Sequence, residues 1–176
     1  FEAINHRNAI YYVEDIIRKE EPFSEWQIRN IHQLILKNID DDNAGRYRQQ
    51  NVLISGATST PPDYTLLNDK MTQLVDWYNS EAHKLHPIER AAKVHADFVG
   101  IHPFIDGNGR TSRLLMNLEL LKAGYPPCVI TVENRLAYYE ALDQWMAYGK
   151  TEAFIQLVSD AVIEGFKPYQ VILNLN

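Results

Sequence analysis

The side chains that could take part in a reaction are concentrated in one stretch, residues 102–113. This stretch reads His-Pro-Phe-Ile-Asp-Gly-Asn-Gly-Arg-Thr-Ser-Arg. An unperturbed imidazole has a pKa of about 6.5, so His102 is largely neutral at physiological pH and can take a proton from a hydroxyl group. Asp106 offers carboxylate oxygens, which are the ligands that Mg²⁺ prefers. The pair predicts a reaction in which a hydroxyl group is deprotonated beside a metal ion.

The second half of this stretch has the composition of a phosphate site. Gly107 and Gly109 bracket Asn108, which lets consecutive backbone N–H groups turn inward around an anion. A helical pattern begins at once, and the N-terminus of a helix favours the same anion. Arg110 and Arg113 are neighbours on the surface of that helix, where guanidinium groups can bind phosphate oxygens. A carboxylate beside several phosphates would repel them unless it held a bridging cation, so the residues predict Mg²⁺-assisted phosphoryl-type transfer.

Structural interpretations of the same residues stay open when each is taken alone. The stretch from Asp106 to Gly109 is also an ordinary turn sequence. An isolated His before Pro usually has a structural role. His95 lies on a mostly apolar helical face, which favours a buried supporting role over metal ligation. The fixed spacing of base, carboxylate, glycines and arginines within one loop favours function over these readings.

Helices are expected to position this loop, because apolar residues recur at three- and four-residue spacing along most of the chain. The helical patterns cover about 3–19, 24–39, 64–81, 87–101, 108–123, 134–147 and 151–166. Pro103 ends the fourth pattern, so His102 is expected at the mouth of the loop between two helices. The sequence therefore predicts an all-α protein.

Residues 51–62 are the exception to the helical pattern. Val52, Leu53 and Ile54 are apolar and include β-branched side chains, and Ser55 and Gly56 follow them. Pro61 and Pro62 close the segment. This composition predicts a small β-hairpin or an extended flap.

Size and charge narrow the functional classes. The chain has 176 residues, is 45% hydrophobic and fits a single domain over 1–176. Its net charge of −6 and the absence of a Lys/Arg run argue against nucleic acid or an anionic membrane as a partner. Cys128 is the single cysteine, and no segment has the ~20 apolar residues of a membrane-spanning helix. We expect a soluble chain with a cytoplasmic location, and the start at Phe1 suggests part of a longer protein.

Residues 102–113 resemble the signature of the Fic family, His-x-Phe-x-Asp/Glu-Gly-Asn-Gly-Arg-x-x-Arg, at every fixed position. Such a match arises by chance at on the order of 10⁻¹⁰ of starting positions. The resemblance extends over about 4–165 and is strongest over a catalytic core of about 85–125. Further stretches, Leu-His-Pro-Ile-Glu at 85–89 and Ala-Gly-Tyr-Pro-Pro at 123–127, are similar to animal endoplasmic-reticulum members and bacterial relatives.

The resemblance implies an all-α Fic-domain helical bundle with a small β-hairpin flap. It implies a protein adenylyltransferase, which moves AMP from Mg·ATP to a Ser, Thr or Tyr hydroxyl of a target protein, with self-modification allowed. The roles implied for the motif are His102 as base, Asp106 as metal ligand, Gly107, Asn108 and Gly109 as phosphate loop, and Arg110 and Arg113 as phosphate ligands. Residues 52–56 would align the target as an added strand. Tyr138, Tyr139 and Leu142 match the border of the adenine site, whereas Met146 stands where close relatives have Asn.

Three alternatives remain at this stage. One is a family member that uses another nucleotide donor or removes AMP. Another is a kinase-like member of the Doc type, against which Gly109 argues because that type carries Lys there. The third is a nucleotide-regulated binding module, against which the base His102 argues. A homodimer is also allowed.

Many family members carry an inhibitory helix with the pattern Ser/Thr-x-x-x-Glu-Gly/Asn. No Ser or Thr of this chain has Glu four residues later. The nearest pattern, Asp160 to Gly165 with Glu164 as its acidic residue, has Asp in place of the hydroxyl residue. We therefore expect any inhibitory segment to precede Phe1, and the chain as given to be active without release.

Overall fold

The computed structural model describes residues 1–172, which form an all-helical structure with no β-strand in this range. Seven α-helices and two short 3₁₀ helices follow one another along these residues. The α-helices are α1 (Glu2–Arg18), α2 (Glu25–Leu36), α3 (Leu67–Ser80), α4 (Pro87–Ile101), α5 (Asn108–Lys122), α6 (Arg135–Tyr148) and α7 (Glu152–Ile172). The 3₁₀ helices are η1 (Tyr64–Leu66) and η2 (Ala82–Lys84). The helical periodicity therefore placed each α-helix correctly, although α2 ends earlier than expected and α7 continues past Pro168.

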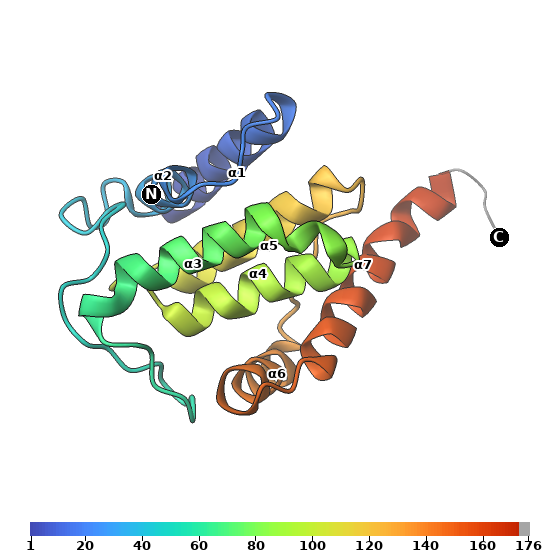
Figure 1. Ribbon diagram of the computed structural model, residues 1–176. Helices are drawn as coiled ribbons and strands as arrows, with labels where there is room; N and C mark the ends of the chain where they lie inside the picture. The colour runs from blue at the N-terminus through green and yellow to red at the C-terminus, as the bar shows by residue number, and fades with distance from the viewer. Residues whose placement is uncertain (173–176) are drawn as a thin grey trace.

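The helices are arranged around α4 and α5, which pack against each other along their length (Figure 1). On one side α1 and α2 pack against each other and against α5, while α3 packs on α4. On the other side α6 and α7 contact each other and α4. The two central helices thus have fixed neighbours on both sides, and the loop between them carries the motif.

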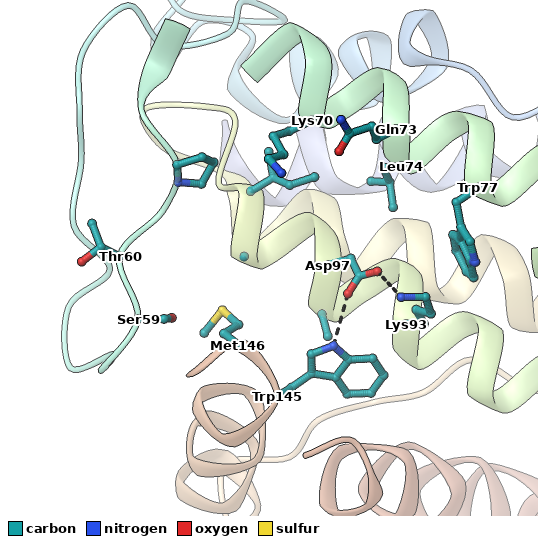
Figure 2. Close-up of a pocket in the computed structure, with 14 residues that line it drawn as sticks. Ser59, Thr60, Lys70, Gln73, Leu74, Trp77, Lys93, Asp97, Trp145 and Met146 are labelled. Atoms are coloured by element: carbon teal, nitrogen blue, oxygen red, sulfur yellow. Dashed lines mark hydrogen bonds and ion pairs between the residues drawn. The ribbon is translucent and has the colours of Figure 1, made fainter. Parts of the chain in front are cut away.

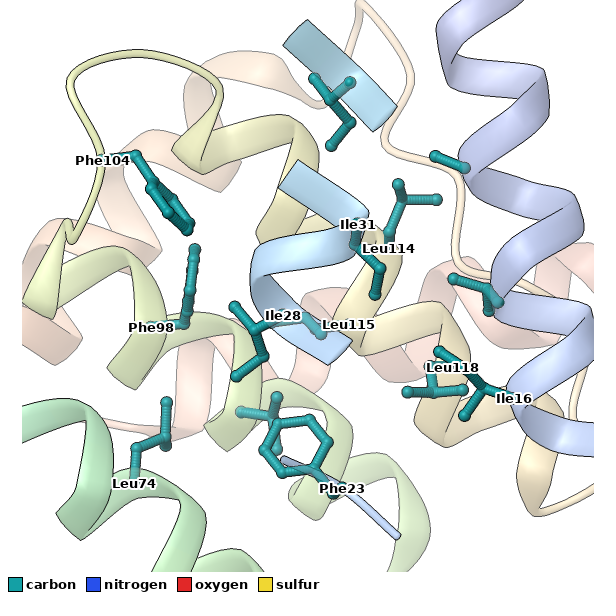
Figure 3. Close-up of a cluster of buried hydrophobic side chains, with 14 of the residues drawn as sticks. Ile16, Phe23, Ile28, Ile31, Leu74, Phe98, Phe104, Leu114, Leu115 and Leu118 are labelled. Carbon is teal, nitrogen blue, oxygen red and sulfur yellow. The ribbon is translucent and has the colours of Figure 1, made fainter. Parts of the chain in front are cut away.

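Two clusters of buried side chains fill the space between these helices. The first lies among α1 to α5 and includes Ile28, Phe98 and Leu115 (Figure 3). The second lies among α4 to α7 and is built around Phe154 and Val158. Burial of each large apolar side chain stabilises the fold by about 1.5–3 kcal/mol. The packing of α5 in both clusters fixes the direction in which its N-terminus points.

A buried ion pair ties the central helices together. Glu119 of α5 is 1% exposed and pairs with Arg90 of α4. The Tyr78 hydroxyl of α3 donates a hydrogen bond to the same carboxylate. A buried carboxylate needs such partners, because leaving it unpaired costs several kcal/mol.

The predicted β-hairpin at 51–62 is not seen in the described residues, and this part of the prediction was wrong. The segment is an extended flap with one turn, in which Ala57 N donates to Ile54 O over 3.1 Å. Pro61 and Pro62 have no N–H groups for a ladder. Thr58 directs its N–H to the Asp143 carboxylate of α6 instead, over 2.6 Å. The returning limb therefore lacks the donors that a hairpin would need.

None of the helices within 1–172 has the length and apolar character required to cross a lipid bilayer.

Candidate active site

His102 stands at the C-terminal end of α4 in a left-handed conformation, with φ 51° and ψ 57°. Its ring Nδ1 lies 3.2 Å from the carbonyl oxygen of Val99. A carbonyl only accepts hydrogen bonds, so Nδ1 carries the proton and Nε2 presents a free lone pair. Burial lowers the pKa of His102, the Val99 carbonyl raises it, and the positive charge of Arg48 lowers it. The imidazole is therefore held neutral in the tautomer that a general base requires.

The loop after His102 is braced from inside by Asn108. This side chain is 3% exposed and spans the turn: Oδ1 accepts from Phe104 N at 3.0 Å, and Nδ2 donates to Phe104 O at 2.8 Å. The side chain of Asn108 therefore shapes the loop, and only its backbone N–H is left for a phosphate.

A second brace, His32 of α2, was not identified from the sequence. Its ring stacks on Phe104 with centroids 3.5 Å apart and is fully buried. Its Nδ1 accepts from Gly45 N at 2.9 Å, so Nε2 carries the proton and donates to Asp106 O at 2.8 Å. Burial lowers the pKa of His32 to about 4, which keeps the ring neutral. No local pattern signals this role, because His32 lies in an ordinary amphipathic helix.

Gly107 is required at its position for two reasons. Its φ of 78° is in the left-handed region that favours glycine. A Cβ atom there would lie 3.1 Å from Nε2 of the His32 ring. This ring is held in place by its contacts with Phe104 and Gly45. The glycine therefore lets the loop approach α2 closely enough for the brace to form.

The N-terminus of α5 is open towards the loop. No side chain caps it, and the N–H groups of its first turn have no partner within the helix. Arg110 lies 2.9 Å from Asp106 and 3.0 Å from Glu2 of α1, measured between guanidinium nitrogens and carboxylate oxygens. Arg110 is thus shared between two carboxylates, both of which are largely exposed.

Arg113 is placed differently from Arg110. Among residues 1–172, no carboxylate lies within ion-pair distance of it. It faces a cavity of about 260 Å³, where Arg135 supplies a second guanidinium that the sequence did not single out. The remaining lining residues are Ile130, Thr131, Val132, Tyr138 and Tyr139. The cavity thus holds two guanidinium groups, and Arg113 has no carboxylate partner among the described residues. This arrangement favours an anionic ligand in the cavity.

A buried polar network supports Arg113 from behind. His95 is fully buried, and its Nε2 lies 3.0 Å from the Tyr138 hydroxyl. Burial raises the pKa of Tyr138 to about 12, and the neighbouring Arg113 opposes that rise. Burial lowers the pKa of His95 to about 3. His95 Nε2 also lies 3.4 Å from the Ser112 hydroxyl, and these two contacts fit the supporting role expected for this residue.

The environment of Asp106 fits a magnesium ion of the kind bound mainly by phosphates. Asp106 is 67% exposed and is the one carboxylate of the loop itself. Mg²⁺ is commonly held by one or two carboxylates, with substrate phosphates and water completing its octahedron. A single exposed carboxylate of the loop beside an open helix N-terminus suits that arrangement, although in this structure Asp106 also pairs with Arg110, and it would not make an all-protein site.

The residues expected around the adenine divide into two groups. Tyr139 is 53% exposed and lines the cavity beside Arg113, as does the buried Tyr138. Leu142 is 3% exposed and belongs to the second core cluster, so its side chain supports α6 from inside. The structure therefore brings Tyr139, and not Leu142, to the surface of the site.

A larger cavity than the one beside Arg113 lies between α3, α4, α6 and the flap (Figure 2). It has a volume of about 610 Å³ and contains Met146 but no residue of the motif. Asp97 accepts hydrogen bonds there from Lys93 at 2.6 Å and from Trp145 Nε1 at 3.2 Å. These three side chains are thus engaged with one another, and the base, carboxylate and arginines of the motif lie outside this cavity.

The flap residues 52–54 alternate between half-buried and exposed positions, as in a strand, and Leu53 is 79% exposed. In the part of the chain that the structure describes, no backbone hydrogen bond engages Val52 or Leu53. Ser55 and Gly56 form the turn at the exposed tip, where Gly56 has a φ of 77°.

Glu164 does not reach the motif in this structure. Its carboxylate is exposed and pairs with Lys167 at 2.6 Å. The expectation that this segment of α7 is not an inhibitor stays a prediction.

Comparison with known proteins gives the same family for the fold and the motif. The model of the Fic/DOC family matches residues 22–120. A protein adenylyltransferase Fic of Nematostella vectensis is 41% identical over 160 residues, which cover 90% of this chain and 37% of that protein. A solved structure of Fic-1 from C. elegans is 34% identical, with a TM-score of 0.88, and the match covers 98% of this chain and 51% of that one. A Fic domain containing signaling protein from Bacteroides thetaiotaomicron is 31% identical, with a TM-score of 0.83 over 92% of this chain and 67% of that one.

The matched range contains the complete motif of residues 102–113, on the loop between the two central helices. The chain belongs to the Fic/DOC family. It spans a little over a third of the length of the Nematostella relative.

Proposed function

We propose that this chain is a protein adenylyltransferase, which moves AMP from ATP to a hydroxyl side chain of a target protein. The observation that carries the proposal is the pairing, on one loop, of a neutral His102 with a free Nε2 and an open helix N-terminus flanked by two arginines. The similarity to relatives named protein adenylyltransferase supports it.

Each group of the site has one task in this reaction. The hydroxyl oxygen of the target attacks the α-phosphorus while its proton passes to His102 Nε2. The bond from the α-phosphorus to the bridging oxygen breaks, and pyrophosphate leaves. The first N–H groups of α5, with Arg110 and Arg113, stabilise negative charge on the phosphate oxygens. Asp106 would hold Mg²⁺, which supplies positive charge to the phosphates when bound.

The flap supports a protein as the acceptor. Its residues 52–54 are extended, and the backbone groups of Val52 and Leu53 are free of partners in the described residues. An extended peptide can add to such an edge as a strand, with affinity from backbone hydrogen bonds. The acceptor hydroxyl would then be carried by a residue of the added strand. A homodimer and a cytoplasmic location stay predictions from the sequence.

The test uses ATP labelled in either the α- or the γ-phosphate. We expect α-label on protein and no γ-label. Label from the γ-phosphate would identify a kinase instead, and nucleotide binding without either label would identify a binding module.

A further inference from the structure

Arg48 is a buried cation outside the motif that contacts the loop of the base. It lies between α2 and the flap, and it is 3% exposed. Its Nε donates to the carbonyl oxygen of His102 at 2.8 Å. Its Nη1 donates to Gln50 O at 2.8 Å, and its Nη2 donates to Pro62 O at 2.6 Å. Its backbone N–H donates to Pro103 O at 2.9 Å, so the residue holds the loop from two points.

The three carbonyl groups that the Arg48 guanidinium binds connect the flap with the base. Gln50 directly precedes the flap and Pro62 ends it, and the side chain of His102 is the base. One planar guanidinium therefore ties both ends of the flap to each other and to the backbone of the base. Within 1–172 no carboxylate lies within ion-pair distance of Arg48, so its direct partners are carbonyl oxygens, and the charge of Asp63 acts on it from further away.

The other contacts of the flap do not reach His102. Asn51 bonds to Asp63 and Tyr64, which joins the flap ends at the surface. Thr58 bonds through its N–H and hydroxyl to Asp143 of α6, at 2.6 and 2.7 Å. These contacts fix the flap to itself and to α6. The position of the flap relative to His102 is therefore fixed by the contacts of Arg48.

Only arginine has the donors for this task. Its three nitrogens diverge in one plane in a fixed fork, so they can serve three carbonyl groups at once. A lysine keeps the charge but concentrates its donors at one point, which leaves two of the three acceptors out of reach. The transfer of AMP to a hydroxyl group is sensitive to such changes, because a misplacement of the reacting atoms by about 1 Å costs on the order of 100-fold in rate.

We propose that Arg48 is a positioning residue, which sets the distance between a hydroxyl group presented by the flap and Nε2 of His102. The proposal rests on the proposed AMP transfer to protein. It separates two acceptors: a protein hydroxyl depends on the flap, whereas water reaches the α-phosphate without it. Loss of Arg48 thus impairs transfer to protein more than transfer to water.

The experiment compares Arg48→Lys with Arg46→Lys, a matched change at an exposed arginine two positions earlier. Three quantities are measured for both variants: α-label incorporated into the chain itself, AMP released to water from Mg·ATP, and the Kd of Mg·ATP. For Arg48→Lys we expect self-modification to fall by about 30-fold or more, release to water by less than about 3-fold, and the Kd to stay within about 2-fold. For Arg46→Lys all three stay at the wild-type values.

Equal losses in both transfers would show a general structural role and overturn the proposal. Unchanged self-modification would overturn it too. Circular dichroism and the urea midpoint establish that the variants are folded. If Arg48→Lys does not fold, Arg48→Gln takes its place, and failure of both to fold would assign Arg48 to the stability of the fold alone.

Hydrogen exchange separates this inference from the proposed function. Faster amide exchange is expected in Arg48→Lys, and not in Arg46→Lys, in peptides that cover 50–62 and 102–104. A wild-type chain that transfers no α-label refutes the proposed function, while the exchange rates still decide whether Arg48 couples the flap to the base. Unchanged exchange in both segments would refute that coupling.

Discussion

Replacement of Gly107 by alanine tests how the loop is held against α2. The new Cβ would lie 3.1 Å from Nε2 and 3.2 Å from Cδ2 of His32. The ring cannot retreat easily, because it is fully buried, stacked on Phe104 and bonded to Gly45. The loop must therefore move instead, and the hydrogen bond from His32 to Asp106 O is stretched or lost.

The loss of folding stability expected for Gly107→Ala has two contributions. A non-glycine residue at a φ of 78° is strained by about 1–2 kcal/mol. A buried hydrogen-bonding group that loses its partner costs about 1–3 kcal/mol more. We expect Gly107→Ala to lower the free energy of unfolding by about 2–5 kcal/mol. A loop shift of a fraction of an ångström beside the base should also slow AMP transfer by about 10- to 100-fold.

Gly124→Ala is the matched control. Gly124 has a φ of 80° at the end of α5, but a Cβ there would meet no atom within 4 Å. It carries the dihedral strain alone, so we expect a loss of about 1–2 kcal/mol and unchanged transfer. Urea unfolding gives the stabilities, and α-label incorporation gives the rates. Equal effects of the two substitutions on stability and rate would refute the argument that the His32 contact makes Gly107 necessary.

Three further outcomes follow from the site. His102→Ala should reduce α-label transfer by about 100- to 10,000-fold while calorimetry finds the Kd of Mg·ATP within about 2-fold, and a parallel loss of affinity would contradict its role as base. Asp106→Ala should leave a low rate that does not respond to added Mg²⁺, and recovery of the wild-type maximal rate at high ATP would exclude a metal-binding role. Because burial lowers the pKa of His95 to about 3, the unfolded chain binds a proton there first as the pH falls below about 6.5. The contribution of His95 to the free energy of unfolding is thus complete above that pH and is smaller by about 2 kcal/mol at pH 5. His95→Gln should remove this part of the pH dependence of stability, as measured by urea unfolding at several pH values. An unchanged pH dependence would refute the argument.

The sequence by itself determined the helices and the place of the motif between two of them. Periodicity placed the α-helices because each buries one apolar face, and Pro103 marked the end of α4 because proline cannot continue the helix. The base, the carboxylate, the glycines and the arginines lie within twelve consecutive residues, so the proposed chemistry could be predicted from their spacing alone. The same local information predicted a helix N-terminus at Asn108.

The tertiary structure alone decided how the loop is held. His32 bonds to a residue 74 positions away, and Arg48 bonds to one 54 positions away. Such contacts join a side chain to a backbone carbonyl, and they leave no trace in periodicity or spacing. The failed hairpin has a similar cause: β-branched residues favour an extended chain, but a ladder also needs donors on the returning limb, and those were absent or taken by Asp143. Leu142 likewise depended on the packing of α6 against α7, which turned it into the core and left Tyr139 at the surface.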